Sequence, residues 1–265
     1  MGYEHILFEA SGGVATITLN RPDTYNSLNL GTLDDLKAAF RAIAKDRGLR
    51  AVVITGAGKG FSSGADLMEI QANFTQIDIT EALRGGLNQV IAAMRSLEKP
   101  IIAAVNGAAA GAGASICLAA DYRIASENAS FVFAAFIGIG LVPDAGGTAL
   151  LAHFVGPAKA LEMYLFADAK NRVSAADAHA LGIANRVVPA DELMTETTAL
   201  ATRLAHMPTK AIGMTKRAIY RAAERSLAET LEYEALLQGA AFRTHDFQEG
   251  VAAFIEKRDP AFKGE

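Results

Sequence analysis

The chain contains one cysteine, Cys117, and no tryptophan. A single cysteine cannot form a disulfide within the chain, so a packed core must supply the stability, and a reducing, cytoplasmic setting is expected. The first residues, MGYEHILFEASGG, lack a basic segment followed by an apolar one. We therefore expect no secretory signal peptide.

Long apolar runs are also missing. No run reaches the roughly 20 residues that a helix needs to cross a bilayer, so no membrane partner is expected. The nearest candidate, IIAAVNGAAAGAGASICLAA (residues 101–120), is interrupted by glycines and by Asn106. That pattern is typical of a buried strand followed by a turn and a helix.

Charge of one sign does not dominate the sequence. The net charge is −4 and no long basic run occurs, so nucleic-acid binding is not expected. The same balance still permits a small anionic ligand, because a few local cations are enough to bind one.

The sequence also lacks clusters of metal ligands and complete nucleotide-binding loops. A phosphate loop fails because Lys59 is followed by Gly60, and a dinucleotide turn fails because Ile116 replaces its third glycine. Cys117 lies in an apolar segment and is expected to be a buried, inert thiol. The histidines are scattered and are expected at the surface or at helix ends: His5, His153, His179, His206 and His245. We expect no metal and no nucleotide cofactor.

Hydrophobic residues make up 51% of the 265 positions, which is enough for one large domain or for a domain with an appendage. Residues 4–9 and 13–20 predict a hairpin around Gly12 and Gly13, and strand and helix patterns then alternate to about residue 188. This order predicts an α/β fold with crossover connections.

Three local expectations follow from the patterning. TLDDLKAAFRAIAKD (32–46) predicts a helix with Thr32 as its N-cap, and ASFVFAA (129–135) predicts a strand. A single helix is expected to present these apolar residues at helical spacing: Leu83, Leu87, Val90, Met94 and Leu97.

After Pro189 the pattern becomes entirely helical, with four helix-like segments and no strand between them. We place a boundary near residue 195, which divides the chain into a core of residues 1–195 and a helical region of residues 196–265. Apolar stripes that the core need not cover would suit oligomerisation.

Two glycine-rich turns stand just ahead of helices. GFSSGADL (60–67) is centred on Ala65, and AAGAGAS (109–115) is centred on Ala112. Helix N-termini leave backbone N–H groups free, and two converging N–H donors would form an oxyanion hole. Tight packing of helix on strand would also favour glycine and alanine, so each motif alone has a purely structural interpretation.

One carboxylate, Asp144, lies inside the apolar and glycine-rich stretch GIGLVPDAGGT (138–148). Turn formation explains a Pro-Asp-Ala-Gly-Gly segment without any catalytic role. Apolar neighbours would raise the pKa of Asp144 by desolvation, whereas the helix that begins near Gly146 would lower it. The sequence leaves the balance of these two effects open.

In combination, these segments resemble the enoyl-CoA hydratase/isomerase (crotonase) family, in particular its ring-type 1,2-epoxyphenylacetyl-CoA isomerases. The matching stretches cover nearly the whole chain: residues 20–28, 54–67, 100–126, 129–148 and 249–264. The resemblance implies a crotonase-like spiral of ββα units with a C-terminal helical region for oligomerisation. It also implies an acyl-CoA thioester as substrate, no cofactor beyond that CoA, and a homo-trimer or hexamer.

The resemblance assigns the oxyanion hole to the N–H groups of Ala65 and Ala112. The two glutamates that hold water in the hydratases are replaced here by Ser115 and Phe136, which disfavours hydration. Asp144 stands where the ring-type isomerases place a catalytic aspartate. Chlorobenzoyl-CoA dehalogenases also place an aspartate there, but beside an aromatic-rich pocket, and this chain has no tryptophan.

The resemblance further implies contacts with CoA and the acyl chain. The implied substrate-binding residues are Asp23, Thr24, Tyr25, Ser63, Gly64, Asp66, Leu67, Met68, Gly111, Ser115, Phe136, Phe254 and Lys257. Phe254 and Lys257 would act from a neighbouring subunit, although a solvated helix end explains Lys257 equally well. Residues 69–90, with Phe74 and Leu83, would line the acyl pocket, but packing in the helix core is the favoured interpretation of those side chains.

We interpret the sequence as an acyl-CoA isomerase in which Asp144 is the acid and base. Two alternatives remain open at this point. One is an atypical hydratase in which Asp144 positions water, and the other is a scaffold that binds acyl-CoA or a protein partner without turnover.

Overall fold

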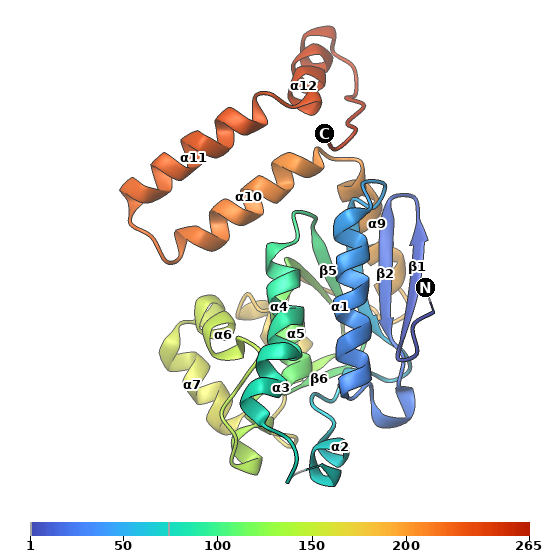
Figure 1. Cartoon of the computed structure of the whole chain (residues 1–265), viewed down its shortest axis with the longest axis vertical. Helices are drawn as coiled ribbons and strands as arrows, with labels where there is room; N and C mark the ends of the chain where they lie inside the picture. Colours follow the sequence, from blue (N-terminus) through green and yellow to red (C-terminus); the bar gives the residue numbers. More distant parts are fainter. Residues whose placement is uncertain (1, 74) are drawn as a thin grey trace.

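The computed structural model describes residues 2–73 and 75–265 (Figure 1). Strands β1 (Ile6–Ser11) and β2 (Val14–Leu19) form an antiparallel hairpin, as predicted. Gly12 and Gly13 connect them with φ values of 57° and 80°, a left-handed turn that glycine adopts without steric conflict.

Two sheets form the centre of the molecule. The six-stranded sheet has the order β1-β2-β3-β5-β7-β10, and the four-stranded sheet has the order β4-β6-β8-β9. Their further strands are β3 (Ala51–Gly56), β4 (Gly60–Ser62), β5 (Ile101–Val105), β6 (Ala108–Ala110), β7 (Tyr122–Ser126), β8 (Ser130–Val132), β9 (Val173–Ser174) and β10 (Arg186–Val188). Each strand from β3 to β7 is followed by one in the other sheet, so the chain winds as repeated ββα units, and the predicted α/β class is confirmed.

Helices cover both faces of the larger sheet. Those before β10 are α1 (Leu30–Lys45), α2 (Leu67–Ala72), α3 (Ile79–Gly85), α4 (Leu87–Ser96), α5 (Ala112–Ala119), α6 (Gly147–Val155), α7 (Pro157–Phe166) and α8 (Ala175–Ala180). Alternate residues of β3 point to opposite faces: Val52 and Ile54 join the cluster that includes α1 and α4, whereas Ala51 and Val53 pack beneath α9 (Leu193–Ala205). Burial on both faces explains why β3 is apolar throughout.

Three local expectations are corrected by the structure. Asn29, not Thr32, caps α1, because the Asn29 side chain accepts the Thr32 N–H at 2.8 Å. The single helix expected through Leu83 and Leu97 is two helices, α3 and α4. They are divided at Gly86, where a Cβ would lie 2.7 Å from the Ala82 carbonyl oxygen.

The third correction concerns the strand expected over residues 129–135. Only β8 (Ser130–Val132) is extended, and the chain then forms two short 3₁₀ turns, η2 (Phe133–Ala135) and η3 (Ile137–Ile139). These turns redirect the chain toward the segment that contains Asp144.

The C-terminal helices project from the core (Figure 1). They are α10 (Thr209–Ala222), α11 (Leu227–Ala241) and α12 (His245–Glu256). Residue 195, where the sequence suggests a boundary, lies within α9, which packs on the sheet, so the projecting part begins after α9. Phe254, Ile255 and Leu231 leave large apolar side chains exposed on these helices. Within the described residues, no helix is both long and apolar enough to cross a membrane.

A buried ion pair attaches α10 to the core. The Lys216 ammonium lies 2.8 Å from the Asp121 carboxylate, which also accepts the Ile101 N–H at 2.7 Å and the Tyr220 hydroxyl. The Arg95 guanidinium stacks 3.1 Å from the centre of the Tyr220 ring. Burial lowers the pKa of Lys216, although Asp121 opposes that shift. The projecting helices are therefore joined to the sheet by charge as well as by apolar contact.

We predict that Asp121→Asn lowers the free energy of unfolding by about 3 kcal/mol, because it leaves the Lys216 ammonium buried without a counter-charge. Chemical unfolding monitored by circular dichroism measures this change. Adding Lys216→Met should recover more than half of the loss, since no unpaired charge then remains. A double variant no more stable than Asp121→Asn would contradict this account of the ion pair.

Candidate active site

A largely apolar cavity of about 410 Å³ brings together the two glycine-rich turns and the segment around Asp144. Ala65, Ala112 and Asp144 all line it. Its apolar walls come from Leu28, Leu30, Leu33, Leu67, Ile70, Ile77, Ile79, Leu83, Leu87, Phe136, Ile139, Leu141 and Val142. A concave apolar site with a few polar groups is the usual form of a small-molecule site.

The first turn leaves the N–H of Ala65 without a partner. Leu28 pairs with this turn by donating its N–H to the Gly64 carbonyl at 2.8 Å and accepting the Asp66 N–H at 3.1 Å. Neighbouring N–H groups of an extended chain point in opposite directions, so the Ala65 N–H points away from Leu28. No acceptor for it occurs among the described residues.

The second turn frees the N–H of Ala112 in the same region. Gly111 has φ 50° and ψ −126°, and Ala112 is the first residue of α5, so its N–H precedes the first intrahelical bond, from Ser115 to Gly111. No acceptor for the Ala112 N–H occurs in the described part of the chain either.

The two turns touch because Gly64 has no side chain. A Cβ at Gly64, which has φ 91°, would lie 2.8 Å from the Ala110 carbonyl oxygen and 3.2 Å from the Ala112 nitrogen. Any other residue would force the turns apart. The predicted pair of N–H donors is thus brought to one cavity, although its role as an oxyanion hole stays a prediction.

Asp144 is a poorly solvated carboxylate at the edge of this cavity. Its Oδ1 atom is buried and has no hydrogen-bond partner among the described residues. Burial raises the pKa of Asp144 to about 6, against a smaller opposing effect of its own backbone N–H. Of the two effects that the sequence leaves open, desolvation is therefore the larger, and the nearby start of α6 does not offset it.

Ser115 and Tyr164 lie behind Asp144. The Ser115 hydroxyl donates to the Asp144 carbonyl oxygen at 3.2 Å. A Cβ at Gly147 would lie 2.6 Å from the Ser115 Oγ atom and 2.7 Å from the Tyr164 hydroxyl, so both oxygens occupy the space beside Gly147. Burial and the charge of Asp144 raise the pKa of Tyr164. Sequence reasoning missed Tyr164, because it sits on the buried face of α7 in an ordinary core pattern.

At the two positions where the hydratases carry glutamates, this structure has no carboxylate. Ser115 is fully buried, and its hydroxyl donates to a backbone carbonyl. The Phe136 ring lies 3.8 Å from the position that a Cβ on Gly111 would occupy. A second carboxylate, Glu69, does line the cavity, and sequence reasoning missed it. Glu69 is partly buried and accepts the Leu30 N–H at 3.0 Å.

Most of the residues implied to bind CoA lie together at one rim. The Ser63 N–H donates to the Tyr25 carbonyl at 2.8 Å, and the Ser63 hydroxyl donates to the Thr24 carbonyl at 3.0 Å. Asp23 lies in the same 3₁₀ turn as Thr24 (Pro22–Thr24), and Met68 is exposed nearby on α2. Contact of these residues with CoA stays a prediction.

Asp66 has structural contacts that the resemblance did not imply. Its carboxylate accepts from the Arg21 guanidinium at 2.8 Å and the Ser27 hydroxyl at 3.0 Å, and it caps α2 through the Glu69 N–H at 3.2 Å. Burial alone would raise the pKa of Asp66, but these hydrogen bonds together hold it below its usual range. Asp66 therefore fixes the turn that presents Ala65.

Two of the implied residues are not brought to this cavity. Phe254, whose side chain is 85% exposed, and Lys257 lie at the end of α12, at the opposite end of the molecule from α2 (Figure 1). Their predicted role requires a neighbouring subunit. Phe74 lies outside the described residues. Leu83 both lines the cavity and packs against the core, and its contact with an acyl chain stays a prediction.

The other groups considered for a chemical role are the Cys117 thiol and possible metal ligands. Cys117 is fully buried in α5, and burial raises the pKa of its thiol, as expected for an inert cysteine. Among the residues that the structure describes, no group of three or more His, Cys, Asp or Glu side chains could hold a metal ion.

Comparisons with known proteins agree in family and fold. The family model described as "Enoyl-CoA hydratase/isomerase" matches residues 9–265. A Rhodobacter capsulatus relative named "Probable enoyl-CoA hydratase" is 42% identical, with 100% of each chain covered. The Escherichia coli 1,2-epoxyphenylacetyl-CoA isomerase is 39% identical over 98% of this chain and 99% of its own. The crystal structure of an enoyl-CoA hydratase from a Polaromonas species superposes with a TM-score of 0.90 at 34% identity, covering 97% of this chain and 99% of that one.

The raised pKa of Asp144 predicts a pH-dependent effect on stability. Between about pH 4 and pH 6 the native carboxyl keeps a proton that the unfolded chain has released, so its contribution to stability is present below pH 4 and is lost as pH rises through 6. The free energy of unfolding of Asp144→Asn minus that of the unsubstituted chain should therefore rise by about 1–2 kcal/mol from pH 4.5 to pH 7.5. Urea unfolding at both pH values measures this, with the exposed Asp191→Asn as control, and equal differences at both would contradict the burial of Asp144.

Proposed function

The chain belongs to the enoyl-CoA hydratase/isomerase family, and within it we propose an acyl-CoA isomerase that moves a double bond, or rearranges a ring, in a CoA thioester. One observation supports this proposal above the others. A single poorly solvated carboxylate, Asp144, lines the same apolar cavity as the unengaged N–H groups of Ala65 and Ala112.

In the proposed reaction, the thioester carbonyl oxygen accepts hydrogen bonds from the Ala65 and Ala112 N–H groups. Asp144 removes a proton from carbon, and the electron pair of the broken C–H bond moves into an enolate whose negative oxygen the two donors stabilise. Protonated Asp144 then returns the proton to a different carbon, so the double bond shifts and no other reagent is consumed. The reaction needs no cofactor besides the CoA of the substrate.

The pKa of Asp144 suits this exchange. With a value of about 6, the carboxyl is ionised at neutral pH yet is a stronger base than an exposed aspartate. Proton transfer in both directions is most efficient when the pKa of the group lies close to the working pH. The apolar walls from Phe136 and Leu141 exclude water, which protects the enolate and favours return of the same proton.

A hydratase is the second candidate, and two observations favour it. Most similar relatives are named enoyl-CoA hydratase, and Glu69 supplies a second carboxylate at the cavity. Against it, Ser115 and Phe136 offer no carboxylate at the positions where the hydratases hold water. The isomerase assignment rests on Asp144, whose Oδ1 atom is buried without a hydrogen-bond partner among the described residues, whereas the Glu69 carboxylate accepts a backbone N–H.

We also propose that the active form is a homo-trimer or hexamer. The projecting helices α11 and α12 expose Leu231, Phe254 and Ile255, and a second copy would cover such side chains. In that arrangement Phe254 and Lys257 reach the CoA bound to a neighbouring subunit. This would explain why the chain alone leaves them far from the cavity.

We predict that Asp144→Asn lowers isomerisation of 3-enoyl-CoA by about 10²–10⁴-fold, because the amide cannot accept the proton. Product analysis and proton exchange in deuterated water measure this, with CoA affinity unchanged. For the unsubstituted chain, kcat/KM should fall about tenfold per pH unit below pH 6, where Asp144 becomes protonated. Surviving isomerisation in the variant would refute the role of Asp144. Faster hydration of 2-enoyl-CoA would favour the hydratase, and binding without any turnover would favour a scaffold.

Ala112→Pro tests the second donor. Proline is tolerated at the first position of a helix, and the preceding Gly111 has no Cβ to clash with it, so the change removes the N–H with little effect on α5. We expect kcat to fall by about 10²–10³-fold with little change in CoA affinity. Ala112→Gly keeps the N–H and should retain activity within about tenfold. Equal activity of the proline and glycine variants would exclude the Ala112 N–H from catalysis.

A further inference from the structure

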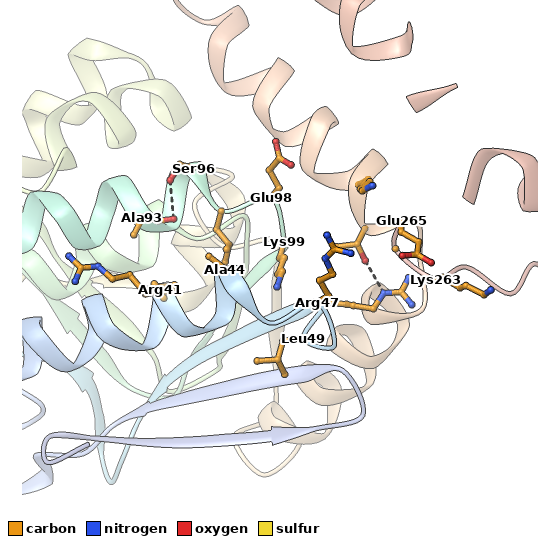
Figure 2. Close-up of a pocket in the computed structure, with 16 residues that line it drawn as sticks. Arg41, Ala44, Arg47, Leu49, Ala93, Ser96, Glu98, Lys99, Lys263 and Glu265 are labelled. Atoms are coloured by element: carbon orange, nitrogen blue, oxygen red, sulfur yellow. Dashed lines mark hydrogen bonds between the residues drawn. The ribbon is translucent and has the colours of Figure 1, made fainter. Parts of the chain in front are cut away.

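A second cavity, of about 460 Å³, lies between the C-terminal ends of α1 and α4, the first turn of α10 and the last residues of the chain (Figure 2). It shares no lining residue with the cavity around Asp144. The two are at opposite ends of α1, since Leu30 and Leu33 line the first, and Arg41 and Ala44 line the second.

The second cavity is strongly cationic. Its basic lining residues are Arg41, Arg47, Arg50, Lys99, Lys210 and Lys263, and its acidic ones are Glu98 and Glu265. Figure 2 shows Arg47 and Lys99 from the core and Lys263 from the C-terminal segment around the same space. Glu98 is already paired with Arg217 at 2.8 Å, which leaves the excess positive charge largely uncompensated.

Two of these cations donate their hydrogen bonds to neutral acceptors, and the Asp46 carboxylate offsets only part of the effect of burial on the pKa of Lys99. Lys99, which is 9% exposed, donates its ammonium protons to the carbonyl oxygens of Ile43 and Asp46. Arg50 donates to the Thr209 hydroxyl at 2.9 Å and to the carbonyl oxygens of two further residues. Carbonyl groups satisfy hydrogen bonding but not charge, and buried charge without a counter-ion is costly. An anion in the cavity would supply the missing counter-charge.

The first turn of α10 adds further donors. Its cap residue, Pro208, has no side-chain acceptor, and the first intrahelical bond runs from the Ile212 N–H to the Pro208 carbonyl. The N–H groups of Thr209, Lys210 and Ala211 therefore have no intrahelical acceptor, and Thr209 and Lys210 line the cavity. The free N-terminus of this 14-residue helix has partial positive charge, which favours phosphate.

Apolar side chains form the rest of the lining. They are Phe40, Ala44, Leu49, Ala93 and Leu97. A bare inorganic ion would leave this surface and most of the volume unused, whereas sites of 300–1,000 Å³ are typical of small organic ligands. We propose that the cavity binds a phosphate-bearing small molecule of nucleotide size, with its phosphates against the cations and the α10 N-terminus and its organic part on the apolar lining.

Such a ligand would connect three parts of the chain. Arg47 follows α1, Lys210 begins α10, and Lys263 belongs to the C-terminal segment. A ligand that binds across all three stabilises the attachment of the projecting helices to the core by mass action, because the separated parts do not bind it. Thermal unfolding therefore provides a second readout beside direct binding.

The test uses ADP as the probe, measured by isothermal titration calorimetry on the full chain without CoA. The proposed acyl-CoA site would also recognise an adenosine diphosphate group, so the binding that is lost in variants of the second cavity is the part that reports on it. We expect ADP to bind and to raise the Tm. The double variant Arg47→Glu with Lys210→Glu should weaken binding at least about tenfold and abolish the Tm shift. Acyl-CoA turnover should stay unchanged, so this outcome is independent of the proposed isomerase activity.

Lys45→Glu is the matched control. It reverses the same charge at the end of α1 but does not line the cavity, and it should bind ADP as the unsubstituted chain does. An equal loss in Lys45→Glu would show general electrostatics and overturn the site. No ADP binding at millimolar concentration would also overturn it, and so would binding of a single-stranded RNA oligonucleotide without binding of ADP.

Discussion

The close contact between two backbone turns is the constraint on which the rest of this structure depends. The turn after β4 and the turn after β6 lie side by side because Gly64 offers no Cβ to the Ala112 nitrogen. Their parallel strands belong to the same small sheet, so the ββα winding delivers both turns to one edge. Two main-chain N–H groups, for which the described residues offer no acceptor, then meet an apolar cavity, and helix geometry keeps them there.

The Asp144 carboxylate at that cavity is destabilised by its surroundings. Apolar neighbours raise the pKa of Asp144, and its ionisation at neutral pH therefore lowers the stability of the native state. The Ser115 hydroxyl holds the backbone of Asp144, and the Tyr164 hydroxyl fills the space beside Gly147. Ser115, at one of the two positions where the hydratases hold water, thus has a structural contact here, and among the described residues the Asp144 Oδ1 atom is left buried without a partner.

Charge also governs how the helical region meets the core. Asp121 and Lys216 attach α10 through a buried pair, whereas Arg50 and Lys99 donate their hydrogen bonds to neutral groups. In α10, the charge of Lys216 is therefore neutralised within the protein, whereas the first turn faces the cationic cavity. Helix α1 links the two cavities, with its first turn at the cavity around Asp144 and its last turn at the cationic one.

The sequence by itself determined the α/β order, the C-terminal helices, the family and the two glycine-rich turns, because hydrophobic period and glycine position are local properties. It misplaced the cap of α1 and the break at Gly86, where a side-chain acceptor and a non-helical backbone conformation set the helix ends. Only the tertiary structure decided the pKa of Asp144, the positions of Tyr164 and Glu69, and the gathering of distant cations around one cavity. Desolvation and charge depend on what lies nearby in space, and residues such as Arg47 and Lys210, far apart in the sequence, become neighbours only when the chain has folded.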